Sequence, residues 1–133
     1  MESKTASELE GLQYEYLEVL ALVENRTSWE MTLNAAHVEW GKFDEGKSPV
    51  NVPANGKMEF SARGRDSSPS GTNGYATWTL KDHPAGKVTV KAAFSNPAAG
   101  FCKAGITCEP AGAVSVKVEG KSQNSFKPHY TIG

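Results

Sequence analysis

Apolar and polar residues alternate with a period of two along most of the chain. The alternation is clearest in four segments, at 57–63, 75–80, 87–94 and 114–119. Successive side chains of a β-strand point to opposite faces of a sheet, so this pattern predicts strands that bury one face. Residues that favour turns separate the apolar segments, at 44–46, 53–56, 82–86 and 96–100.

Three further segments extend the strand pattern. Residues 14–24 are rich in β-forming residues and place one apolar face at Leu17, Val19, Ala21 and Val23. Along 29–42 the apolar positions change from odd to even numbers, which predicts a β-bulge near Ala35 and Ala36. The last strand is expected at 126–132, where Pro128 indicates an edge strand because proline has no N–H to donate.

These strands predict an all-β fold. About seven segments, with no helical pattern after residue 12, indicate a single-domain antiparallel β-sandwich over residues 13–133. The polar residues 1–12 are expected to form a loose N-terminal tail. A chain of 133 residues has the length of one domain and can bury a core without disulfides or metals.

The net charge and the distribution of apolar residues exclude some kinds of partner and some locations in the membrane. The formal net charge of −1 creates no overall field that attracts nucleic acid, so we expect no nucleic-acid partner. No run of 18 apolar residues is present, and the polar N-terminus lacks the apolar segment of a Sec signal peptide. Asn25-Arg26-Thr27 matches a glycosylation sequon, but without a signal peptide its modification is not expected.

Cys102 and Cys108 leave three interpretations open. They are two separate thiols, or a disulfide that closes a short loop, or metal ligands. A disulfide requires Cα atoms within about 7 Å of each other. The metal interpretation is the weakest because no second Cys or His pair has zinc spacing, so we expect neither a metal nor a cofactor.

Known catalytic motifs do not occur in the chain. His37, His83 and His129 stand far apart, and neither H-E-x-x-H nor G-x-S-x-G is found. We therefore expect that the protein is not an enzyme. A hydrolase whose histidine site assembles only in space is an alternative, because catalytic triads are defined by geometry.

The segment 63–74 is the first candidate for a binding site. It combines glycines with arginines and hydroxyl groups, among them Arg63, Arg65, Ser70 and Thr72. The lysine and the following helix of a P-loop are missing, so nucleotide binding is disfavoured. Backbone N–H groups beside an arginine can still hold a phosphate-like anion. The alternative is a surface loop whose Gly and Ser residues only satisfy turn geometry.

Trp40 is the second candidate. All three tryptophans fall on strand patterns, which favours positions in the core. Trp40 differs because it ends its strand and is followed closely by Lys42 and Phe43, an arrangement that suits a bilayer interface. Tyr14 and Tyr16 would add amphipathic rings if their strand ends at the same edge.

Several segments together resemble the aegerolysin family. They are Trp40-Gly41-Lys42, Gly64-Arg65, Ser70-Gly71-Thr72-Asn73-Gly74, the residues 94–100, and His129-Tyr130-Thr131-Ile132. Their order and spacing carry the resemblance. The last two segments resemble the bacterial branch, which includes the small subunit of binary insecticidal toxins.

The resemblance implies a β-sandwich close to the actinoporin shape and a protein that is not an enzyme. It implies binding to membranes that contain sphingolipids or sterol. It also implies a larger pore-forming partner, either a MACPF-type protein or a bacterial β-pore toxin, with haemolytic or insecticidal activity. Family members generally lack a signal peptide, so we expect production in the cytoplasm, release by a non-classical route and action at target-cell membranes.

Individual residues carry the resemblance in part. Trp40 matches a family tryptophan that lines the lipid site. Ser70 stands where several fungal members have a glutamate that selects ethanolamine head groups, and Ala98 stands where they have a membrane-facing tryptophan. Phe101 is a candidate replacement for that ring, and two tyrosines stand in place of an early tryptophan.

The sequence thus predicts a membrane-lipid-binding edge on a cytolysin or toxin component. Its members are Trp40, Lys42, Phe43, Arg63, Arg65, Ser70, Thr72, Phe101, Tyr14 and Tyr16. The alternative function is a carbohydrate- or protein-binding β-sandwich without membrane activity.

Overall fold

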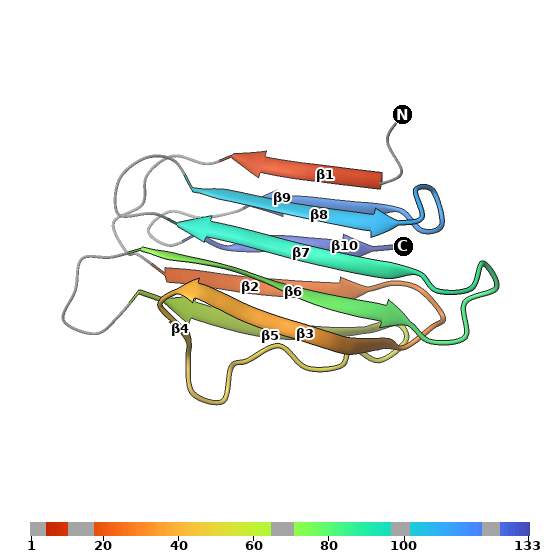
Figure 1. Ribbon diagram of the computed structural model, residues 1–133, viewed down its shortest axis with the longest axis horizontal. Helices are drawn as coiled ribbons and strands as arrows, with labels where there is room; N and C mark the ends of the chain where they lie inside the picture. Colours follow the sequence, from red (N-terminus) through yellow and green to blue (C-terminus); the bar gives the residue numbers. More distant parts are fainter. Residues whose placement is uncertain (1–4, 11–17, 65–70, 97–101, 121–125) are drawn as a thin grey trace.

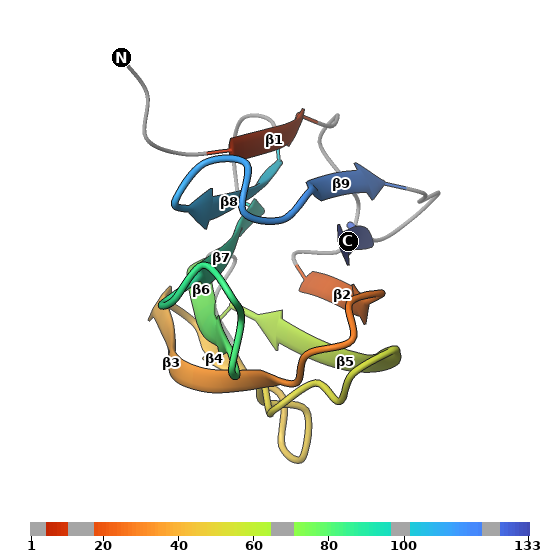
Figure 2. The same ribbon diagram turned by 90° about the vertical axis from the view of Figure 1, so that its right-hand side faces the viewer.

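The computed structural model describes residues 5–10, 18–64, 71–96, 102–120 and 126–133 as two five-stranded β-sheets packed face to face (Figures 1 and 2). Sheet one contains, in spatial order, β1 (Thr5–Glu10), β8 (Lys103–Glu109), β7 (Thr89–Asn96), β6 (Thr72–Leu80) and β3 (Met31–Trp40). Sheet two contains β4 (Lys42–Phe43), β5 (Gly56–Arg63), β2 (Glu18–Asn25), β10 (Pro128–Ile132) and β9 (Val116–Gly120). The predicted all-β sandwich is confirmed.

The core lies between the two sheets and is built by the period-two pattern. In β6 the buried side chains alternate with half-buried ones along the whole strand, and β7 buries the alternate residues Val90, Ala92 and Phe94. Trp78 is fully buried, and its indole Nε1 donates a hydrogen bond to the carbonyl oxygen of Val50 at 2.9 Å. The alternation predicted for 75–80 and 87–94 is therefore confirmed, whereas 57–63 departs from it at Ser61, which is buried like Phe60 and Ala62 on either side of it.

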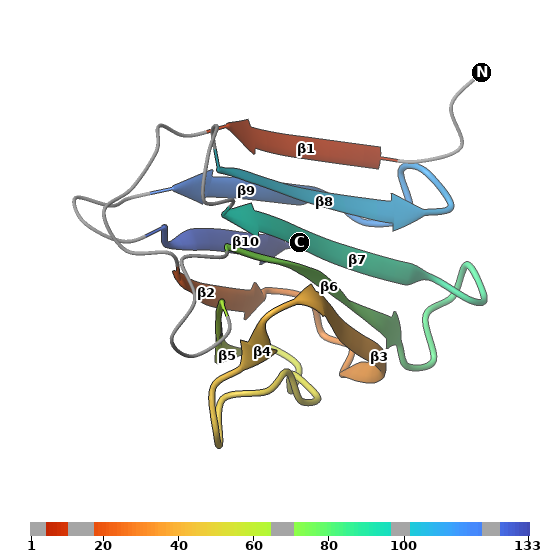
Figure 3. The same ribbon diagram turned by 60° about the vertical axis from the view of Figure 1, so that its left-hand side comes forward.

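The two long sides of the sandwich are closed in different ways. On one side β1 lies beside β9, and the Oγ of Ser7 accepts a hydrogen bond from the backbone N–H of Val118 at 3.2 Å. On the other side the chain passes from β3 in sheet one through Gly41 into β4 in sheet two (Figure 3).

The prediction of a loose N-terminal tail was wrong for residues 5–10. This segment forms β1 and pairs antiparallel with β8 over six residues, from Thr5 opposite Cys108 to Glu10 opposite Lys103. The outer edge of β8 offers unpaired backbone groups, and hydrogen bonding to that edge orders a polar segment that shows no apolar period.

The strand β8 was missed in the sequence. Its buried residues are Cys102, just before the strand, and then Ala104, Ile106 and Cys108. They do alternate, but small residues and cysteines make a weak apolar signal. The two cysteines stand six residues apart along this extended segment, about 20 Å, so the proposed disulfide between them is excluded.

Three predictions about the strands had different outcomes. The pairing of β3 with β6 shifts register between Leu33 and Ala35, which confirms the bulge one residue earlier than expected. The edge position of Pro128 was wrong, because β10 lies between β2 and β9. Pro128 is the first residue of its strand, where a missing N–H is tolerated. The pairing of β10 with β2 is parallel, unlike the antiparallel arrangement predicted throughout.

The sequon residue Asn25 is part of the interior. Its side chain is fully buried, and its Nδ2 donates to the carbonyl oxygens of Trp29 at 2.7 Å and Pro53 at 3.1 Å. Its Oδ1 accepts from the backbone N–H of Thr27 at 3.0 Å and from the Thr27 hydroxyl at 2.6 Å. In the folded protein this amide is closed to a glycosylating enzyme, and its role is to hold the turn between β2 and β3.

Candidate functional site

The end of β3, the start of β4 and the end of β5 lie at one end of the sandwich (Figure 3), and these strand ends carry Trp40, Lys42 and Arg63. Lys42 pairs with Arg63 across the β4–β5 ladder, and Trp40 precedes Lys42 by two residues. Gly41 joins them with a φ of +93°, and a Cβ at this position would overlap the carbonyl oxygen of Arg63. Only glycine allows this close approach, so Gly41 sets the position of Trp40 beside β4.

Trp40 is the exposed aromatic residue of this end, which we call the Trp40 rim (Trp40, Lys42, Arg63). Its exposed fraction is 58%, whereas Trp78 in the same sheet is fully buried. The core interpretation therefore fails for Trp40. A large apolar ring that stays in water on a rigid strand end is available to a partner surface.

Phe43 belongs to the core more than to the surface. It is half-buried, and its ring centroid lies 6.1 Å from that of Phe60 and 6.3 Å from that of Phe94 in edge-to-face geometry. These contacts anchor β4 against the sandwich. Phe43 thus supports the position of Lys42.

Arg63 is held by an acidic partner. Its Nε donates to Oδ1 of Asp44, and the Oδ2 of Asp44 accepts from the Ser61 hydroxyl at 2.5 Å. Burial alone would raise the pKa of Asp44, but the hydrogen bonds from Ser61 and Arg63 outweigh it and leave the pKa below its usual value. The Arg63 side chain remains 51% exposed, so it lies at the surface as part of an ion pair.

The remaining predicted site residues divide into two groups. Thr72 lies at the start of β6, but its side chain is only 1% exposed, so its hydroxyl does not face the surface. Its Oγ1 has no hydrogen-bond partner in the part of the chain that the structure describes. The others lie outside the described residues: Tyr14, Tyr16, Arg65, Ser70 and Phe101.

Charges of both signs surround the Trp40 rim. Glu39 and Glu45 are exposed close to it in the chain, and Oε2 of Glu39 accepts from Nδ2 of Asn73 at 3.3 Å. Among the described residues, this end thus carries an exposed indole, an amine and a guanidinium on neighbouring strand ends, together with carboxylates, and the guanidinium of Arg63 is paired with Asp44. A mixture of both signs suits a neutral or zwitterionic surface better than a highly anionic one.

The three histidines and the other possible metal ligands can be placed individually in the described part of the chain. The histidines lie on different elements: His37 on β3, His83 in the β6–β7 turn and His129 on β10. Within those residues no group of three or more His, Cys, Asp and Glu side chains is placed to hold a metal ion. The described segments also contain no helix with the length and apolar character needed to cross a membrane.

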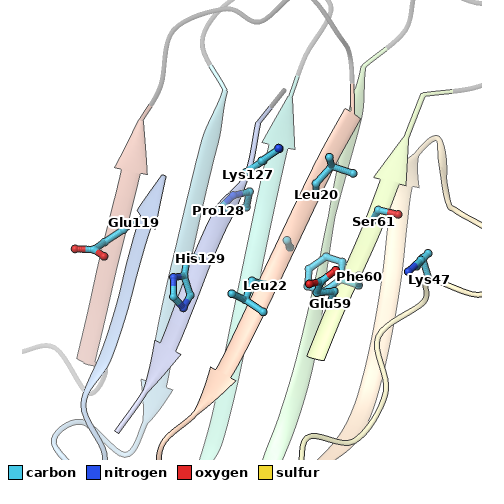
Figure 4. Close-up of a pocket in the computed structure, with 11 residues that line it drawn as sticks. Leu20, Leu22, Lys47, Glu59, Phe60, Ser61, Glu119, Lys127, Pro128 and His129 are labelled. Carbon is cyan, nitrogen blue, oxygen red and sulfur yellow. The ribbon is translucent and has the colours of Figure 1, made fainter. Parts of the chain in front are cut away.

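The outer face of sheet two has a groove that the sequence analysis did not predict (Figure 4). Its floor contains Leu20 and Leu22, which project outward from β2. The signal was present as the run Val19 to Val23, which is apolar at every position and so is apolar on both faces of the strand.

Comparisons with known proteins identify the fold. No family model matches the chain, and no curated protein matches it. The crystal structure of the lipid-binding protein nakanori superposes with a TM-score of 0.69 at 12% identity, over 92% of this chain and 72% of that one. The RahU protein, solved in complex with a Tris molecule, superposes with a TM-score of 0.59 at 18% identity, over 87% of this chain and 93% of that one. At these identities the likeness establishes a shared β-sandwich fold.

Proposed function

We propose that the protein binds lipid membranes through the Trp40 rim. The observation that carries the proposal is the exposed indole of Trp40, at the end of β3 on a fold shared with the lipid-binding protein nakanori. Lys42 follows two residues later and pairs with Arg63 across the β4–β5 ladder, so a lipid phosphate can meet these cations while the ring enters the interface.

The finer proposal follows the resemblance to aegerolysins of the bacterial branch. In it the protein is the lipid-recognising component of a two-component cytolysin, specific for membranes with sphingolipid or sterol. It acts with a larger pore-forming protein and so contributes to haemolytic or insecticidal activity. It is released by a non-classical route and catalyses no reaction. A two-sheet sandwich with a closed core is well suited to recognition, and the partner would supply the membrane-spanning element.

The size of the Trp40 contribution can be bounded. A tryptophan side chain has about 200 Å² of surface, and 58% of Trp40 is exposed, so full burial in the bilayer contributes at most about 3 kcal/mol. Half of that value, for partial insertion, corresponds to about a tenfold change in the partition coefficient. Tight binding therefore needs several rims on one membrane, which an assembly with a partner would provide.

Sedimentation with vesicles tests the proposal. Phosphatidylcholine vesicles with and without sphingomyelin, ceramide phosphoethanolamine and cholesterol are compared, using the wild type and Trp40→Ala. The matched control is Trp29→Ala, because Trp29 precedes β3 at the opposite end of the sandwich. We expect binding that Trp40→Ala weakens about tenfold and that Trp29→Ala leaves unchanged while both variants remain folded by circular dichroism. Absence of binding to every mixture would refute the proposal.

A further inference from the structure

The strand β2 is apolar on both faces, and the part of the chain that the structure describes buries only one of them fully. Val19, Ala21 and Val23 are buried in the core. Leu20 and Leu22 point away from it and are half-buried, at the centre of the outer face of sheet two. Strands that are apolar on both faces belong to sheets covered on both faces, whereas an open face normally carries polar residues. A bound ligand could therefore cover Leu20 and Leu22 on this face.

The outer face is hollowed above these leucines. The groove has a volume of about 470 Å³, and Leu20, Leu22 and Pro128 form its apolar part (Figure 4). Volumes of this size are typical of sites for small molecules. A flat protein surface would leave such a hollow empty, so we favour a small ligand over a second copy of the chain.

The charged residues lie at the two ends of the groove. Lys47 and Glu59 line the side of β5, and Lys127 and Glu119 line the side of β9 and β10, with the leucines between them (Figure 4). Each end thus has one amine and one carboxylate, and the two positive and two negative charges of these four residues cancel. The exposed pair between Glu119 and Lys117, at 2.8 Å, contributes little and can exchange for a ligand amine.

Two other polar groups of the groove are committed to structural contacts. The Ser61 hydroxyl donates to Asp44 at 2.5 Å, and Nε2 of His129 lies 3.0 Å from Oε1 of Glu24. Lys47, Glu59 and Lys127 remain at the ends to select the ligand, together with Glu119, whose carboxylate must exchange its pair with Lys117 to receive a ligand amine. A ligand with a large net charge meets no excess of opposite charge here, whereas a molecule with an ammonium at one end and a carboxylate at the other is paired at both ends.

The width of the sheet sets the length of the ligand. From β5 to β9 there are three inter-strand intervals of about 4.8 Å, or about 14 Å in all. An extended tripeptide spans about 10 Å, and the flexible Lys and Glu side chains can close the remaining distance. A phospholipid fits poorly because both of its charges lie at the same end of the molecule.

We propose that this groove binds short apolar peptides with free termini, which lie across the strands with aliphatic side chains on Leu20 and Leu22. This site is separate from the Trp40 rim and does not depend on the lipid-binding proposal.

The probe is trileucine, titrated into the full chain and followed by amide chemical shifts. We expect saturable binding with a dissociation constant below about 10 mM. Trileucine with acetylated and amidated ends should bind at least about fivefold more weakly, because it has lost both charges. No saturable binding, or equal binding of the capped peptide, overturns the proposal.

Variants locate the site. Leu22→Thr keeps a β-forming residue and should weaken trileucine at least about fivefold. The double variant Lys47→Ala, Lys127→Ala changes only exposed amines, so it keeps the fold and should show the same loss. Trp40→Ala should bind trileucine normally, and Leu22→Thr should bind vesicles normally, which separates this proposal from that of the rim. Unchanged trileucine binding by both groove variants overturns it, as does a dimer that Leu22→Thr abolishes.

Discussion

Asn25 offers a quantitative test of how the structure is held together. Replacing it by alanine removes four well-formed hydrogen bonds, two donated to the carbonyl oxygens of Trp29 and Pro53 and two accepted from Thr27. The side chain is fully buried, so water does not replace these partners without local opening. The four bonds join the end of β2 to the start of β3 and to the turn before β5.

The expected loss follows from the number of bonds. A net contribution of about 1 kcal/mol for each bond gives a decrease of about 4 kcal/mol in the free energy of unfolding. The chain has 133 residues, and an unfolding entropy of about 2.1 cal/mol/K per residue converts this decrease into a fall in Tm of about 14 °C. Because small domains have only about 5–15 kcal/mol of stability, the loss is large.

The assay is thermal unfolding followed by far-ultraviolet circular dichroism, with Asn34→Ala as the matched control. Asn34 is exposed and donates one side-chain bond to the Thr79 hydroxyl at 2.7 Å, so its loss should cost under about 1 kcal/mol, or about 3 °C. If Asn25→Ala melts within about 3 °C of this control, the interior role assigned to Asn25 is wrong.

Three further changes are predicted. Asp44→Asn should lower the free energy of unfolding most above about pH 5 and progressively less toward pH 2. The reason is that the carboxylate of Asp44 has a lower pKa in the folded protein than its unfolded value of 3.8. It therefore stabilises the fold above the unfolded pKa, and this stabilisation is lost as the pH falls through the folded pKa. Urea titrations across that range measure the difference, and a constant difference would contradict the reasoning. Tyr130→Phe removes the buried hydrogen bond from the phenol to the carbonyl oxygen of Ala93 at 2.5 Å and should lower the free energy of unfolding by about 1–2 kcal/mol in the same assay; an unchanged free energy would contradict this contribution. Gly41→Ala combines a positive φ with overlap at Arg63 and should cost at least about 2 kcal/mol, whereas Gly86→Ala, also at positive φ but in open space, should cost less; equal calorimetric losses would argue against the close approach at Arg63.

Part of the candidate site was accessible from the sequence. The position of Trp40 at the end of its strand predicted an exposed ring, and Trp40 is 58% exposed. The role of Arg63 was less accessible, because its partner Asp44 stands 19 residues away and belongs to a turn that looks unremarkable in the sequence. Leu20 and Leu22 were not predicted as a binding surface, because the alternate residues Val19, Ala21 and Val23 already account for a strand with one buried face.

The sequence by itself determined the strands that bury one face against the core, such as β5, β6 and β7. Their alternation is local, and it requires no knowledge of the partner strand. Only the tertiary structure decided which sheet each strand joins, that β10 pairs parallel with β2, and that the polar segment 5–10 becomes a strand. Pairing and burial depend on contacts between residues far apart in the chain, and a strand's own residues do not specify which edge it will meet.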